Sequence, residues 1–99
     1  MSVICHITTA AEWNAAKPSG SYAATSLKDE GFIHCCLPEQ VPSILQRYFE
    51  GRKGLVKLIL ETDRLNSQLI YEWSPSVQET FPHIYGPINT DAVIEVEEI

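Results

Sequence analysis

Three histidines lie in short apolar segments of the kind that form β-strands, and they are the only histidines of the chain. The segments are Ile4-Cys5-His6-Ile7, Phe32-Ile33-His34-Cys35-Cys36 and Phe81-Pro82-His83-Ile84-Tyr85-Gly86. Imidazole has a pKa close to neutrality, so it can donate or accept a proton under physiological conditions. A histidine in a half-buried strand needs hydrogen-bond partners or a function. We therefore expect the three imidazoles to share one site.

His34 and His83 are the main candidates for chemistry. His34 lies in a segment that ends a predicted strand just before a helix that starts near Pro38, and strand ends often carry functional residues. His83 and Tyr85 lie on one face of a segment that Pro82 and the following Pro87 stiffen, which suits a preorganised site. The alternatives are a structural histidine at position 34 and a proline-braced edge strand around His83.

Three further residues are candidates for the same site. Glu72 lies between two aromatic residues and is a candidate acid, base or hydroxyl-polarising group, with an exposed strand residue as the alternative. Tyr22 follows a turn and either stacks on a planar ligand or covers the core. His6 shares a strand face with Ile4 and Thr8, and it is either part of the site or structural.

Familiar catalytic and metal-binding motifs are missing. The chain has no GxGxxG, GxxxxGK, GxSxG or HExxH sequence, which excludes the usual nucleotide loops and the serine-hydrolase elbow. Cysteines and histidines are present, but no CxxC or HxxxH spacing joins them. Adjacent Cys35 and Cys36 would point to opposite faces of a strand. We expect no metal site.

Size and composition predict one soluble domain over residues 1–99. No apolar run approaches the roughly 20 residues that cross a bilayer, and the N-terminus does not resemble a signal peptide, so we expect a cytoplasmic protein. Three cysteines, two of them adjacent, favour reduced thiols. A net charge of −6 argues against nucleic acid as the main partner. The expected partner is a small-molecule or nucleotide ligand.

The elements that must position these residues follow from apolar patterning. Strands are predicted over residues 3–8, 32–35, 55–61, 69–73, 81–85 and 92–96, and a loop over 74–80. One main helix follows a capping box at Thr9 and Glu12, and a second follows Pro38, with a helical turn over 26–31 between them. The apolar stripe of the second helix is Val41, Ile44, Leu45, Tyr48 and Phe49. The prediction is a small α+β domain with a mostly antiparallel sheet, in which residues 55–61 form a central strand.

The order of several short sequence motifs, among them the three histidine segments, resembles that of the bacterial domain-of-unknown-function 952 family (DUF952). The resemblance spans nearly the whole chain. The two longest matching motifs are Gly31-Phe32-Ile33-His34-Cys35 and Phe81-Pro82-His83-Ile84-Tyr85-Gly86-Pro87. Shorter matches include His6, Trp13, Gly20-Ser21-Tyr22, Gln40 and Glu72. One departure is visible, because the family usually has serine where this chain has Cys36.

The resemblance implies a small split sheet like that of ADP-ribosyltransferases, around a cleft for nicotinamide adenine dinucleotide (NAD). It assigns the ribose contact to His6, the second position of the superfamily's set of site residues to His34, stacking to Tyr22 or Tyr85, and catalysis to Glu72 or His83. Cleavage of a glycosidic bond passes through a cationic sugar, which needs a carboxylate or oriented hydroxyls more than a metal. The histidine segments contain no arginine or lysine for a pyrophosphate.

Three functions remain open from the sequence. The first is an enzyme of the ADP-ribosyl or phospho-ribosyl transferase type that acts through a histidine-rich cleft, with NAD as co-substrate. The second is a non-catalytic small-molecule or nucleotide-binding domain of the same fold. The third is a structural role for the histidines in an assembly subunit.

Overall fold

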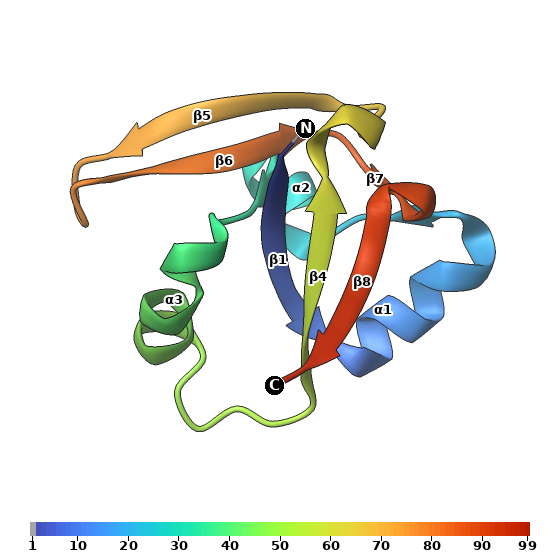
Figure 1. The fold of residues 1–99 in the computed structure, drawn as a ribbon, viewed down its shortest axis with the longest axis horizontal. Helices are drawn as coiled ribbons and strands as arrows, with labels where there is room; N and C mark the ends of the chain where they lie inside the picture. The colour runs from blue at the N-terminus through green and yellow to red at the C-terminus, as the bar shows by residue number, and fades with distance from the viewer. Residues whose placement is uncertain (1) are drawn as a thin grey trace.

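Short strands and α-helices alternate up to strand β4 (Leu55–Glu61) in the computed structural model, which describes residues 2–99, and the remaining elements are strands and short 3-10 turns (Figure 1). The strands are β1 (Val3–Thr9), β2 (Ser21–Tyr22), β3 (Ile33–His34), β4 (Leu55–Glu61), β5 (Gln68–Ser74), β6 (Glu79–Tyr85), β7 (Ile88–Asn89) and β8 (Val93–Glu98). The α-helices are α1 (Ala10–Ala16), α2 (Thr25–Glu30) and α3 (Val41–Tyr48). Short 3-10 turns cover Lys17–Ser19, Pro38–Gln40, Thr62–Arg64 and Thr90–Ala92. None of these helices is long and apolar enough to span a membrane.

The strands form three small sheets, and their pairings are antiparallel. The sheet orders are β1-β4-β8, β3-β6-β5 and β2-β7. The predicted small α+β class with a mostly antiparallel arrangement is therefore confirmed. The β2-β7 pair was not predicted, because it joins two-residue segments that lie far apart in the sequence and carry no periodic pattern.

Strand β4 has the predicted bounds and the predicted central position. Its side chains alternate between two apolar clusters, with Leu58 and Leu60 in one and Leu55 in the other. Both faces of the strand are therefore covered, which accounts for its nearly continuous apolar sequence. β1 alternates in the same way, with Ile4 in the first cluster and Cys5 in the second.

The two main helices form where their local signals predict. The Thr9 side chain accepts a 3.1 Å hydrogen bond from the Glu12 backbone N–H, as the capping box requires, and α1 buries Trp13 in the core. Pro42 falls in the first turn of α3, where the missing N–H costs little. α2 ends at Gly31, whose φ of 89° is the left-handed conformation that favours glycine.

Strand β6 lies in the middle of its sheet rather than at an edge, which corrects the edge-strand alternative for His83. The Pro82 carbonyl accepts a 3.1 Å hydrogen bond from Cys35 N–H, so the nitrogen of Pro82 faces the same neighbour. β3 ends at His34, so no ladder bond from the proline nitrogen is needed there. The short partner strand lets a proline occupy a central strand.

The segment after β3 joins the two three-stranded sheets. Cys5 and Cys36 exchange backbone hydrogen bonds of 2.7 and 2.8 Å, which attaches this segment to the free edge of β1. The β5-β6 hairpin extends over α3, and both lie on the same side of β1 in Figure 1. One region of the molecule is thus surrounded by three elements: the free edge of β1, helix α3 and the β5-β6 hairpin.

Candidate functional site

A pocket of about 540 Å³ lies between these elements, within the size range of small-molecule sites. All three histidines contribute to its lining, His6 from β1, His34 from β3 and His83 from β6. Its apolar wall includes Ile44, Tyr48, Phe49, Trp73 and Phe81. The sequence predicted that Tyr48 and Phe49 share one apolar stripe of the helix. The structure places both on the pocket, and Phe49 also packs against the second core cluster.

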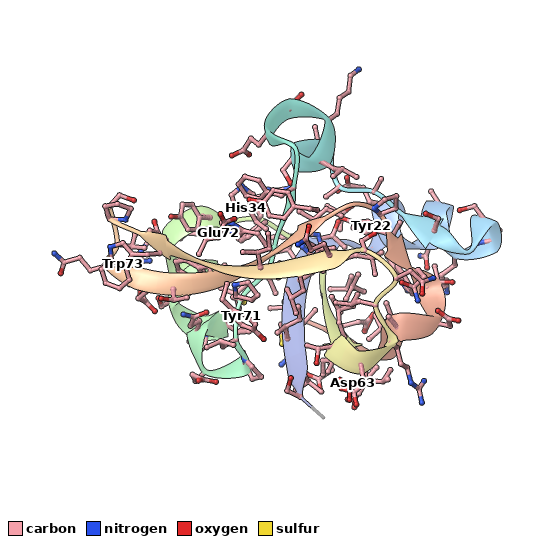
Figure 2. The ribbon with its side chains drawn as sticks, turned by 90° about the horizontal axis from the view of Figure 1, so that it is seen from above. Tyr22, His34, Asp63, Tyr71, Glu72 and Trp73 are labelled. Atoms are coloured by element: carbon pink, nitrogen blue, oxygen red, sulfur yellow. The ribbon has the colours of Figure 1, made fainter. Side chains whose placement is uncertain are left out.

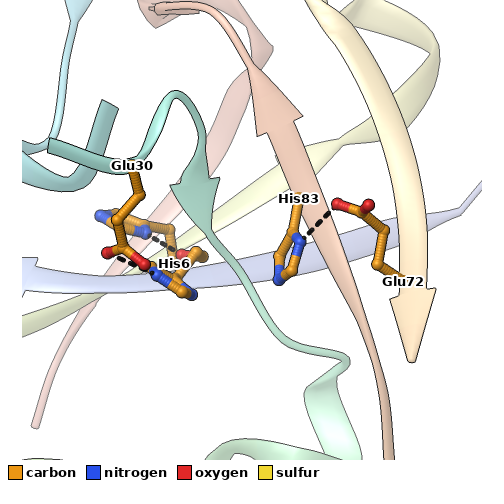
Figure 3. A network of polar contacts seen from close by, with 5 residues as sticks. His6, Glu30, Glu72 and His83 are labelled. Carbon is orange, nitrogen blue, oxygen red and sulfur yellow. Dashed lines mark hydrogen bonds and ion pairs between the residues drawn. The ribbon is translucent and has the colours of Figure 1, made fainter. Parts of the chain in front are cut away.

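His83 is held by a carboxylate on the neighbouring strand. Glu72 lies opposite Phe81 in the β5-β6 register, so its side chain is on the same face as His83 and Tyr85. Its Oε1 is 2.7 Å from His83 Nδ1 and also accepts a hydrogen bond from the Tyr85 hydroxyl. Because a carboxylate accepts, Nδ1 carries a proton and Nε2 is left as the basic nitrogen of the neutral ring. Figure 3 shows the second ring nitrogen on the side away from Glu72.

These hydrogen bonds shift the acidity of both partners of the hydroxyl–carboxylate contact. The hydrogen bonds from Tyr85 and then His83 lower the pKa of Glu72, while the bond to Glu72 raises the pKa of Tyr85. Glu72 is therefore ionised and Tyr85 protonated at neutral pH. Glu72 lies on the His34 side of β5, and Tyr71 lies on the other side (Figure 2).

His34 forms a second imidazole–carboxylate pair beside the first. His34 and His83 are direct partners in the β3-β6 register, and their ring centroids are 5.4 Å apart in an edge-to-face arrangement. His34 Nε2 is 3.0 Å from an oxygen of Glu30, four residues earlier at the end of α2 (Figure 3). The His34 side chain is 54% exposed and that of His83 only 14%, so the His83 pair is the more enclosed.

Phe32 packs the two imidazoles together, a role that the sequence did not indicate. Its ring stacks on His83 with a centroid distance of 4.2 Å and an interplanar angle of 22°, and its edge contact with His34 is 4.9 Å. The alternation of side chains along a strand puts Phe32 on the same face as His34. That period was the signal that could have identified it.

His6 lines the pocket, but both of its ring nitrogens are engaged. Nδ1 donates to the His34 carbonyl oxygen at 2.6 Å, and Nε2 is 2.9 Å from the Tyr22 hydroxyl. Burial lowers the pKa of His6 to about 4, so the ring is neutral at pH 7. Through these two hydrogen bonds His6 connects β1 with β3 and β2, and so it helps to fix the backbone of His34 at the pocket.

Tyr22 lies in the core at 2% exposure and is not part of the pocket lining. Its hydroxyl is 2.9 Å from both His6 Nε2 and Thr8 Oγ1, and burial raises its pKa to about 12. Of the two sequence alternatives, this position corresponds to covering the core. Stacking of Tyr22 on a ligand stays a prediction, because Tyr22 is not among the residues that line the pocket.

A Tyr22→Phe variant measures what this buried hydroxyl contributes. The change keeps the ring but leaves the partners in the core without a hydrogen bond, so we expect a loss of about 1–3 kcal/mol in the free energy of unfolding. Urea unfolding measures it. Tyr71→Phe, at a position 49% exposed, is the control and should change stability by less than about 0.5 kcal/mol. Equal effects of the two changes would contradict a structural role for the Tyr22 hydroxyl.

The cysteines of the pocket are protonated thiols. Burial raises the pKa of Cys36 to about 12 and that of Cys35 well above its ordinary value. Burial also raises the pKa of Cys5, the third cysteine of the lining, so none of the three is a thiolate nucleophile at neutral pH. Within residues 2–99, no group of three or more histidine, cysteine, aspartate or glutamate side chains is arranged to hold a metal ion.

Basic side chains stay outside the pocket. No lysine or arginine among the described residues lines it. Arg47 pairs with Glu79 at 3.8 Å, and the Arg52 guanidinium lies 5.2 Å from the centre of the Phe49 ring. An anionic ligand inside the pocket would therefore lack a lysine or arginine partner.

Comparisons with known proteins identify the family. Residues 7–96 match the family model described as "Protein of unknown function (DUF952)". The crystal structure of protein CC0527 from Caulobacter crescentus is 35% identical, with a TM-score of 0.83, and the match covers 96% of this chain and 83% of that one. The solution NMR structure of CC0527 is 32% identical with a TM-score of 0.83, over 100% of this chain and 85% of that one. The comparison with curated proteins gives no match. The chain belongs to the DUF952 family.

Proposed function

We propose that the pocket binds a small organic ligand and that His83, oriented by Glu72, accepts a proton during a transfer reaction on that ligand. The observation that carries this proposal is the His83–Glu72 pair in a pocket shared with His34. The Glu72 carboxylate accepts the hydrogen bond from Nδ1–H and so leaves Nε2 free to act as a general base. A general base positioned within hydrogen-bond distance of the reacting proton typically raises a reaction rate about 10²–10⁴-fold. His34 with Glu30 supplies a second proton-carrying group.

The narrower form of the proposal is ADP-ribosyl or phospho-ribosyl transfer from NAD or a related nucleotide. Its support is the family resemblance and the split antiparallel architecture with a pocket between the sheets. In such a step the bond between the ribose and its leaving base breaks, and the electron pair departs with the base. A water or acceptor hydroxyl forms the new bond to the ribose as its proton passes to His83 Nε2. The pyrophosphate would remain outside the lining, since no basic residue lines the pocket.

Incubation with NAD tests this form directly. We expect nicotinamide release by the wild-type protein, measured by chromatography, and a rate at least tenfold lower for His83→Gln because glutamine cannot accept the proton. Glu98→Gln removes an exposed carboxylate of β8, outside the pocket, and should leave the rate unchanged. Equal rates for His83→Gln and the wild type would overturn the base role. The absence of both release and binding at millimolar NAD would overturn the narrower form.

A non-catalytic binding domain is the second candidate. The observation that favours it is the lack of an activated nucleophile, since the pocket thiols are protonated and Glu72 is occupied by two hydrogen bonds. This candidate predicts that NAD or a fragment of it shifts the NMR signals of His83 while no nicotinamide is released.

A further inference from the structure

We infer that the pocket selects a planar aromatic ligand with a positive charge and rejects its carboxylate analogue. This inference names the ligand class of the site and rests on the proposed function only in assigning the pocket to a small organic ligand. It depends on two features of the described residues: the charge of the two histidine–glutamate pairs, and the aromatic side chains that line the same pocket as the two histidines.

The two pocket histidines and the glutamates paired with them carry no net positive charge in either protonation state of the imidazoles. Each histidine–glutamate pair has a charge of −1 with a neutral imidazole and 0 with a protonated one, so the two pairs together carry between −2 and 0. His6 is neutral and the thiols are protonated, as described above. When the pairs are negative, they attract a cationic ligand and repel an anionic one. When both imidazoles are protonated, the pairs are neutral overall and offer an anionic ligand no excess of positive charge.

The aromatic wall favours the same kind of ligand. Tyr48, Trp73 and Phe81 reach the pocket from three different elements. Tyr48 is 58% exposed and Trp73 60%, so neither ring has its main role in the core. Figure 2 shows Trp73 at the end of the hairpin, away from the central sheet. Such rings offer their faces to planar groups and to cations.

An isosteric series of ligands tests the inference. Benzamidine, benzamide and benzoate have the same size and shape but carry positive, zero and negative charge. We expect benzamidine to bind at least tenfold more tightly than benzoate, with benzamide between them. Titrations followed by ¹H–¹⁵N NMR give each Kd from the indole N–H of Trp73. The indole of Trp13, which is 6% exposed in the core, is the internal control and should not respond.

Charge variants identify the source of the selectivity. Glu72→Gln and Glu30→Gln each remove one negative charge behind an imidazole, and each should lower the ratio of benzoate Kd to benzamidine Kd severalfold. Glu30 is about half exposed, so its variant keeps the test valid if Glu72→Gln impairs folding. Glu98→Gln should leave the ratio unchanged. A wild-type preference for benzoate, or no response of Trp73 to any member at millimolar concentration, would overturn the inference.

These binding results are separate from the catalytic test. The expected ligand order without nicotinamide release would support the ligand class and count against transfer from NAD. Nicotinamide release that depends on His83, combined with a preference for benzoate, would keep the proposed function and remove the inference about ligand charge.

Discussion

An Ile84→Ala variant is expected to lose about 2–5 kcal/mol of the free energy of unfolding, the usual cost of removing a buried branched side chain and leaving a cavity. Ile84 is fully buried and pairs with Ile33 on one side and Leu69 on the other. It therefore lies where all three strands of the β3-β6-β5 sheet meet the core. Urea unfolding, analysed with a common slope, measures the loss.

An Ile94→Ala variant is the matched control for this result. It removes the same atoms from strand β8 at a position that is 49% exposed. We expect a change of less than about 1 kcal/mol, because little apolar surface leaves the core. Comparable losses for the two variants would mean that β6 does not join the core as described. The consequence for the site is direct, since Ile84 lies between His83 and Tyr85 in the chain.

The sequence predicted elements whose signals are local. The bounds of β4, the Thr9 cap and the glycine at the end of α2 each depend on a few neighbouring residues, and the structure confirms all three. β2 and β7 are only two residues long and are stabilised by each other, so neither carries a periodic pattern. Elements of this kind require knowledge of the tertiary fold.

Local sequence patterns also predicted some parts of the candidate site and failed to predict others. The two-residue period along β6 placed His83 and Tyr85 on one face, and both contact Glu72. Periodicity along α3 identified which residues share a face, but it could not tell whether the face that includes Tyr48 covers the core or lines a pocket. The sequence did not identify Glu30 as the partner of His34, because the two residues lie in different elements on either side of the turn at Gly31.

The pH dependence of stability should report directly on His6. The pKa of this buried ring is about 4 in the folded protein, against an ordinary value of 6.5. Between these values the unfolded chain binds a proton that the folded protein does not, so the free energy of unfolding falls as the pH falls from 6.5 towards 4. The pKa difference corresponds to roughly 3 kcal/mol, complete at pH values below the folded pKa.

A His6→Gln variant should remove this part of the slope, because glutamine does not titrate. We expect its stability at pH 7 to be lower than that of the wild type, because the change disturbs the two hydrogen bonds of the buried ring. The slope between pH 6.5 and 4 is therefore the measured quantity, not the absolute value. His34→Gln retains His6 together with the His34 backbone carbonyl to which His6 donates, and it should retain the His6 contribution. An unchanged slope in His6→Gln would show that the ring is not held neutral. The slope difference therefore tests whether His6 is a neutral support of the pocket or a group that exchanges protons within it.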